Sequence, residues 1–188
     1  MAPGTQDHWI DRLRSAPDRR ALVTLVERLE GAGLVCALGG SGLLAACGLA
    51  DQVRDWDLTT DAPIERVKAT VAGEQFQYKG PDDLHADRKL MFADGEVELI
   101  LQFAFQAPCG VVRIPTWVSD RRDGIPLGSP EAWAVAYHLL KREAKSEALL
   151  GYLETRGADA GAITRLLEEP LPAGLASRLA TLPTSRTT

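Results

Sequence analysis

Two aspartates, Asp55 and Asp57, stand two positions apart in a stretch, residues 54–60, whose pattern predicts a β-strand. Side chains two positions apart on a strand point to the same face, so the two carboxylates would lie side by side while Trp56 and Leu58 face the interior. Neighbouring carboxylates repel each other, and a shared divalent cation removes that penalty. Because hard oxygen ligands suit Mg²⁺ or Mn²⁺, the pair predicts a site for one of these metals.

A glycine-rich turn, Gly39-Gly40-Ser41, follows an apolar run over residues 34–38 and precedes the expected start of a short helix. Glycine lets a backbone turn sharply and approach a ligand without a side-chain clash. Free amide groups at the start of a helix favour phosphate, and the hydroxyl of Ser41 can donate to the same phosphate or cap the helix. The turn therefore predicts a phosphate-binding loop formed by Gly39, Gly40 and Ser41.

A third carboxylate, Glu98, lies between the apolar residues Val97 and Leu99 on the second strand of an expected hairpin. Alternation along a strand places Glu98 on the opposite face from both neighbours. Glu96 shares the face of Glu98, but it adjoins the turn and is expected to be exposed, so Glu98 is favoured. A carboxylate here would complete a two-metal site, in which ions about 4 Å apart hold the attacking and leaving oxygens of a phosphoryl transfer.

The glycine-rich turn, the aspartate pair that follows it after 13 residues, and the later glutamate resemble, in this order, the polymerase-beta-like nucleotidyltransferase superfamily. The sequence is most similar to the small prokaryotic branch, which includes toxin-type members of toxin–antitoxin systems and aminoglycoside-modifying members. The resemblance covers residues 34–103, and residues 129–155 are similar to the C-terminal helices of the superfamily. It implies an α+β fold, with a nucleotidyltransferase-like mixed sheet flanked by helices.

The resemblance also implies a role for each matching residue. Gly40 and Ser41 would bind the triphosphate of an NTP such as ATP, and Asp55 and Asp57 would hold the metal ions that bridge it. Glu98 would be the third metal-binding carboxylate, nearest to the attacking hydroxyl and the candidate for its base. The implied enzyme moves a nucleoside monophosphate from the NTP to a hydroxyl acceptor and releases pyrophosphate. RNA, a small molecule and a protein are the alternative acceptors.

The elements that must position these residues are expected in an α+β core over residues 1–128. The stretch from Asp7 to Gly31 predicts one or two helices, and Ser15-Ala16-Pro17-Asp18 resembles a capping box at a helix start. Asp94-Gly95 between two strand-like runs predicts the hairpin that carries Glu98.

Other parts of the sequence have weaker or different patterns. A short strand is expected at residues 75–78 and another at 111–118, where Pro115 favours a sheet edge. The predicted C-terminal helices span residues 129–143, 144–155, 158–168 and 174–182. The sequence thus predicts a C-terminal helical region over 129–182 and a disordered tail over 183–188.

Composition limits the class of protein. The chain has 188 residues, of which 45% are hydrophobic and 25% charged, enough for a folded core. A net charge of −5 disfavours a broad nucleic-acid-binding surface. No apolar run approaches the roughly 20 residues needed to span a membrane, and the N-terminus lacks the pattern of a secretory signal. Three separated cysteines predict free thiols, so a cytoplasmic protein is expected.

Two other interpretations fit part of the sequence. Residues 40–45 match a dinucleotide-binding glycine pattern, and Asp61 lies near the position of a ribose-binding acid. That interpretation leaves Asp55 and Asp57 without a role. The stronger alternative is a non-catalytic member of the same fold that senses a nucleotide or binds a partner protein through the apolar helix over 130–140. A homo-oligomer is also compatible with the sequence.

Overall fold

The computed structural model describes residues 9–185. Three expectations concern residues outside this range: the helix start at Asp7, the absence of a secretory signal at the N-terminus, and the end of the tail at 186–188. Within the described part of the tail, the backbone of Ala158 donates a hydrogen bond to Pro183 O at 2.7 Å and accepts one from Ser185 N at 2.9 Å. These two bonds tie residues 183–185 to the body of the protein.

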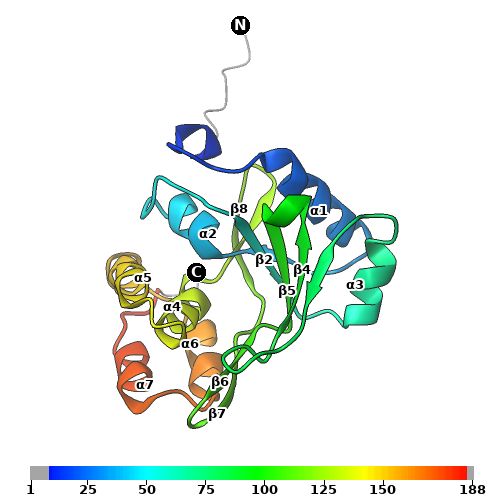
Figure 1. Cartoon of the computed structure of the whole chain (residues 1–188). Helices are drawn as coiled ribbons and strands as arrows, with labels where there is room; N and C mark the ends of the chain where they lie inside the picture. The colour runs from blue at the N-terminus through cyan, green and yellow to red at the C-terminus, as the bar shows by residue number, and fades with distance from the viewer. Residues whose placement is uncertain (1–8, 186–188) are drawn as a thin grey trace, which may run out of the picture.

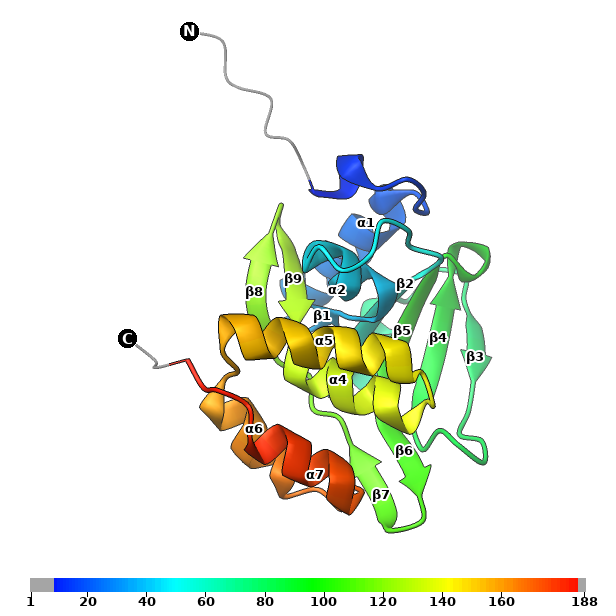
Figure 2. The ribbon, with the colours of Figure 1, turned by 90° about the vertical axis from the view of Figure 1, so that its left-hand side faces the viewer.

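A seven-stranded mixed sheet forms the centre of the fold (Figures 1 and 2). Its strands, in chain order, are β1 (Ala37–Leu38), β2 (Trp56–Thr60), β3 (Gln77–Lys79), β4 (Arg88–Phe92), β5 (Val97–Leu101), β8 (Val118–Arg122) and β9 (Ile125–Gly128). Their spatial order is β3-β4-β5-β2-β1-β9-β8, with β2–β5 and β1–β9 parallel and the other neighbours antiparallel. A separate hairpin pairs β6 (Ala104–Ala107) with β7 (Gly110–Arg113). The expected mixed sheet is confirmed.

Helices cover both faces of this sheet. The α-helices are α1 (Arg19–Gly31), α2 (Gly40–Ala46), α3 (Ile64–Thr70), α4 (Pro130–Leu139), α5 (Glu143–Arg156), α6 (Ala160–Leu167) and α7 (Ala173–Ala180), and short 3-10 helices lie at Trp9–Arg12 and Ala93–Gly95. In Figure 1, α1 and α3 lie on one side of the sheet and α4 and α5 on the other. Figure 2 shows α4 and α5 crossing in front of the strands, with α6, α7 and the β6–β7 hairpin beyond one end of the sheet. The α+β fold class is confirmed.

Helix α1 begins where polar residues give way to an apolar repeat. Its buried residues recur at helical spacing: Leu22, Leu25, Val26 and Leu29. The N-cap is Asp18, whose carboxylate accepts a hydrogen bond from Arg20 N at 2.9 Å. The prediction of a capping box that starts at Ser15 is therefore wrong. Ser15 lies too far before the helix to cap it and forms an isolated bridge with Gln52 instead.

The hairpin predicted at Asp94-Gly95 is confirmed. Strands β4 and β5 pair in an antiparallel register that runs from Phe92 opposite Val97 to Arg88 opposite Leu101. Asp94 and Gly95 have φ angles of 53° and 92°. Glycine adopts this left-handed region without strain, and aspartate is among the residues that enter it most readily. The short turn sets the register of β5 against β4 and so determines which face of the sheet receives Glu98.

The structure corrects the single strand expected at residues 111–118. Pro115 lies in the connection between β7 and β8, and the chain forms two hairpins here. Strand β8 is an edge strand that carries Arg121 and Arg122, so it lacks the alternating apolar pattern by which a strand is recognised. Its partner β9 is fully buried and pairs with β1 in parallel, Leu127 beside Leu38. This pairing brings the start of α4 next to the glycine-rich turn.

Helix α4 is apolar on nearly every side because the chain itself covers it. The Trp133 ring packs against Phe103 with a centroid distance of 5.2 Å, and Ser146 of α5 donates a hydrogen bond to Ala134 O at 2.8 Å. Burial within the fold accounts for the apolar sequence of α4, so that sequence is no longer an argument for a partner protein. Among the helices of residues 9–185, none has both the length and the apolar character to cross a membrane.

Candidate active site

Asp57 and Glu98 lie directly opposite each other on adjacent strands. The parallel register of β2 and β5 pairs Asp57 with Glu98 and Trp56 with Val97. Trp56 and Val97 are fully buried on one face, whereas the two carboxylates are half-buried on the other. Glu96 precedes β5, where its carbonyl accepts a hydrogen bond from Trp56 N at 2.8 Å. The structure therefore brings Glu98, rather than Glu96, beside the aspartate.

Asp55 lies just before β2, so the predicted strand start at Arg54 is wrong by two residues. The side chain of Asp55 is 15% exposed and accepts hydrogen bonds from the Arg54 guanidinium at 3.0 and 3.2 Å. Asp55 and Asp57 nevertheless line the same cleft, which has a volume of about 500 Å³. The two aspartates share this cleft although only Asp57 belongs to β2.

The glycine-rich turn packs against Asp57 so closely that it has no room for side chains. Gly40 has a φ angle of 54°, and a β-carbon added to it would lie 1.8 Å from Asp57 Oδ2. A β-carbon on Gly39 would lie 1.9 Å from the Trp133 ring, and Gly39 N donates a hydrogen bond to Asp57 O at 2.7 Å. The turn thus holds its backbone against the central carboxylate, and only glycine fits at both positions.

Ser41 places a hydroxyl at the edge of this turn. The N-cap of α2 is Gly39, and no described side chain caps the helix, so of the two alternatives for Ser41 the structure excludes the helix cap. Within residues 9–185 the buried hydroxyl of Ser41 finds no hydrogen-bond partner, although it lines the cleft beside Asp57. A buried polar group without a partner costs about 1 to 3 kcal/mol, and a bound ligand that accepts a hydrogen bond removes that cost.

Two basic residues at the start of α5 line the opposite wall of the cleft. Arg142 is the N-cap of α5 and Lys145 lies in its first turn; both reach the cleft, whereas Lys141 does not. Lys145 Nζ lies 5.3 Å from the centre of the Tyr137 ring, and neither basic side chain forms an ion pair with another described residue. All three basic residues were candidates for phosphate contact from the sequence, and the packing of α5 against α4 brings only Arg142 and Lys145 to the cleft.

The environment of the cleft acts strongly on the ionisation of Asp57. Burial, together with the negative charges of Asp55 and Glu98, raises the pKa of Asp57 to about 7, although Lys89 and Arg142 oppose this shift. On the opposite wall, burial and the charge of Arg142 lower the pKa of Lys145. The cleft therefore sets a negative centre beside a positive wall, and each would be stabilised by a bound ion of the opposite charge.

The carboxylates have the donor chemistry of a site for a hard divalent cation. Carboxylate oxygens suit Mg²⁺ or Mn²⁺, and the Ser41 hydroxyl, which has no hydrogen-bond partner among the described residues, marks the same cleft as a ligand site. In the part of the chain from 9 to 185, however, no three His, Cys, Asp or Glu side chains are arranged to hold a metal ion. Lys89 Nζ lies 2.8 Å from Glu98 Oε2 and holds the third carboxylate.

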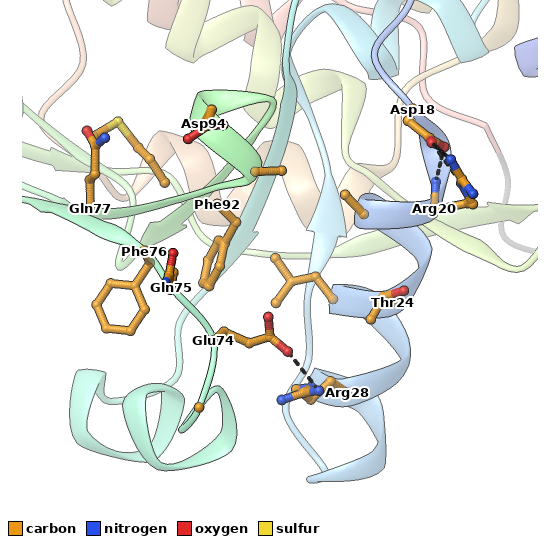
Figure 3. A pocket seen from close by; sticks show the side chains of 15 residues that line it. Asp18, Arg20, Thr24, Arg28, Glu74, Gln75, Phe76, Gln77, Phe92 and Asp94 are labelled. Atoms are coloured by element: carbon orange, nitrogen blue, oxygen red, sulfur yellow. Dashed lines mark hydrogen bonds and ion pairs between the residues drawn. The ribbon is translucent and has the colours of Figure 1, made fainter.

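A larger hollow of about 1240 Å³ lies on the α1 side of the protein, between α1, the segment 73–77 and the end of β4 (Figure 3). None of the carboxylates described above lines it. Figure 3 shows that its walls carry two ion pairs, Asp18 with Arg20 and Glu74 with Arg28. Because these basic groups are already neutralised, the smaller cleft around Asp57 is the better candidate for phosphate chemistry.

A mixed sheet with adjacent carboxylates on β2 and β5, and a glycine-rich turn before α2, has the architecture of a nucleotidyltransferase fold. No protein-family model matches this chain, and no curated protein matches it either. Among solved structures, the antibiotic-resistance factor ANT(2'')-Ia is similar, with a TM-score of 0.51 and 18% identity over 87% of this chain and 95% of that one.

A second similar structure is TM1012 from Thermotoga maritima, assigned as a nucleotidyltransferase, with a TM-score of 0.49 and 20% identity over 72% of this chain and 92% of that one. The likeness to ANT(2'')-Ia concerns the fold, since the sequences differ at most positions. This likeness confirms the nucleotidyltransferase-like fold that the sequence resemblance implied.

Proposed function

We propose that this protein is a nucleotidyltransferase that moves a nucleoside monophosphate from an NTP to a hydroxyl acceptor. The observation that carries the proposal is the arrangement around Asp57, which faces Glu98 across two parallel strands and lies against Gly40. The same cleft holds the Ser41 hydroxyl, for which residues 9–185 offer no hydrogen-bond partner. Carboxylates and phosphate donors that converge in one cleft match the needs of phosphoryl transfer.

The triphosphate would lie between the glycine-rich turn, Gly39-Gly40-Ser41, and the N-terminal end of α5. Ser41 would donate its hydroxyl to a phosphate oxygen, and Gly40 would let the backbone approach that phosphate. Arg142 and Lys145 would neutralise phosphate charge from the opposite wall, where they have no acidic partner among the described residues. Hydrogen bonds between ionised groups are about twice as strong as neutral ones, so this wall would supply much of the affinity.

Asp55, Asp57 and Glu98 would hold the divalent cations. When bound, such ions neutralise the leaving pyrophosphate and lower the pKa of the attacking hydroxyl. Asp57 is the central ligand because it borders both of the other carboxylates and the turn. Glu98 is not among the residues that line the cleft with Arg142 and Lys145, and it would face the acceptor hydroxyl.

The structure argues against the dinucleotide-binding interpretation. Strand β1 pairs with β2 in an antiparallel register, Leu38 opposite Leu58. A dinucleotide-binding fold requires parallel strands joined by the helix that follows the glycine pattern. The glycine pattern at residues 40–45 therefore has a different structural setting here.

The direct test is calorimetry of the four common nucleoside triphosphates with the full chain, with and without Mg²⁺. Binding that requires Mg²⁺ in the wild type and disappears in Asp57→Asn would support the proposal. Glu96→Gln is the matched control, because it removes a carboxylate that lies near the site but outside it. This variant should bind the triphosphate as the wild type does. If the wild type binds no triphosphate, the enzymatic proposal fails. If it binds, labelled nucleotide can be used to test RNA, cationic small molecules and proteins as acceptors.

A further inference from the structure

Lys89 is the cation that contacts the third carboxylate. It lies on β4, one diagonal step from Glu98 on the neighbouring strand, and its Nζ donates a hydrogen bond to Glu98 Oε2 at 2.8 Å. The two side chains are only 18% and 19% exposed. An ion pair shielded from water in this way is screened less than a surface pair and keeps its geometry.

The ion pair between Arg54 and Asp55 is more exposed than the ion pair between Lys89 and Glu98. The Arg54 side chain is 81% exposed, so its contact with Asp55 is a surface ion pair of small net strength. Lys89, in contrast, is surrounded by acids, since Asp57 and the buried Asp87 also act on it electrostatically. The ammonium group therefore lies where the negative charge of the site is densest, which is where a divalent cation would also be most stable.

We infer that Lys89 is a built-in counter-ion that competes with a metal ion for Glu98, so that the third carboxylate joins the metal site only when this ion pair opens. The inference rests on the proposed function, because it assigns Glu98 to the metal site. It also accounts for a feature of the structure: Asp57 and Glu98 are in direct register, yet the described carboxylates are not arranged around a metal position.

The test is Mn²⁺ binding to the full chain, without nucleotide, measured by calorimetry. Lys89→Met keeps most of the aliphatic stem and removes the charge, and it should bind Mn²⁺ about tenfold more tightly than the wild type, equivalent to about 1.4 kcal/mol. Lys89→Arg retains a cation next to Glu98 and should bind Mn²⁺ as the wild type does. Thermal unfolding of each variant verifies that it is folded.

Two controls separate competition from a general effect of charge. Arg142→Met removes a cation that also acts on Asp57 but forms no ion pair with a described carboxylate. This variant should change the affinity for Mn²⁺ by about twofold at most. In a Glu98→Gln background, Lys89→Met should change the affinity by about twofold at most, because the carboxylate for which Lys89 competes is gone and only its through-space effect on Asp57 remains.

Equal gains in Lys89→Met and Arg142→Met, or a tenfold gain that persists in the Glu98→Gln background, would overturn the inference while the proposed function stands. A gain in Lys89→Arg as large as that in Lys89→Met would overturn it as well. If the wild type and every variant bind no Mn²⁺, the metal site itself is refuted, and the proposed function falls together with the inference.

Discussion

The carboxylate of Asp57 occupies the space that a side chain at Gly40 would need. A β-carbon at position 40 would lie 1.8 Å from Oδ2 and 2.6 Å from Cγ of Asp57. Gly40 also has a positive φ angle, 54°, which residues with a β-carbon rarely adopt. The glycine-rich turn and the aspartate strand are therefore interdependent: the position of the central carboxylate requires a glycine here.

Gly40→Ala should destabilise the protein by about 2 kcal/mol or more and abolish triphosphate binding, because the methyl group displaces the Asp57 carboxylate. Urea unfolding and calorimetry measure the two effects. Gly48→Ala is the control, since Gly48 also has a positive φ angle, 76°, but no described atom lies within 4 Å of its added β-carbon. That variant should lose only about 1 kcal/mol and still bind the triphosphate.

Asp57→Asn should stabilise the metal-free protein at high pH. The pKa of Asp57 is raised to about 7 in the folded state, from 3.8 in its ordinary state. Between these values the unfolded chain releases a proton that the folded protein keeps, so the stability of the wild type falls as the pH rises through this window. The Asp57→Asn variant cannot ionise at this position, so its stability does not fall in this way as the pH rises.

At pH 8 in a chelator, Asp57→Asn should exceed the wild type by on the order of 1 to 3 kcal/mol, and the difference should disappear near pH 4. Urea unfolding at a series of pH values measures this difference in the free energy of unfolding. A destabilised variant, or a difference that does not change with pH, would contradict this account of Asp57.

Ser41→Ala should weaken triphosphate binding without weakening the fold. The buried Ser41 hydroxyl has no partner among the described residues, so its removal should not lower the stability of the ligand-free protein and should raise it by up to about 1 to 3 kcal/mol. The lost hydrogen bond to a charged phosphate should raise the Kd about tenfold or more. Ser146→Ala provides the opposite control: this buried hydroxyl donates to Ala134 O at 2.8 Å, so its loss should reduce stability by about 1 kcal/mol and leave the Kd unchanged.

Arg142→Gln and Lys145→Gln should each raise the Kd for triphosphate about tenfold, since each removes a positive charge from the wall of the cleft. The salt dependence of binding should also become shallower, because fewer ionic contacts remain. Lys141→Gln removes the same charge one residue before Arg142 but outside the cleft, and it should bind as the wild type does. Similar losses of triphosphate affinity in all three variants would show a general effect of charge. They would contradict the assignment of Arg142 and Lys145 to the phosphate-binding wall.

Local patterns in the sequence predicted much of the fold. Trp56 and Leu58 alternate with Asp57 because side chains on a strand alternate between faces, and the structure buries both as expected. The hairpin at Asp94-Gly95 follows from residues that accept positive φ angles. The capping box at Ser15 and the strand at 111–118 were wrong because a nearer carboxylate caps α1 and an exposed edge strand can be highly charged.

The sequence by itself determined which residues are candidates for the chemistry, since the glycine-rich turn, the aspartate pair and Glu98 are recognisable from residue type and short-range spacing alone. Only the tertiary structure decided that Glu98 stands opposite Asp57, that Lys89 holds Glu98, and that Arg142 and Lys145 face the aspartates. The reason is physical. Periodicity reports which face of its own element a residue occupies, whereas strand pairing and helix packing depend on contacts between residues far apart in the chain.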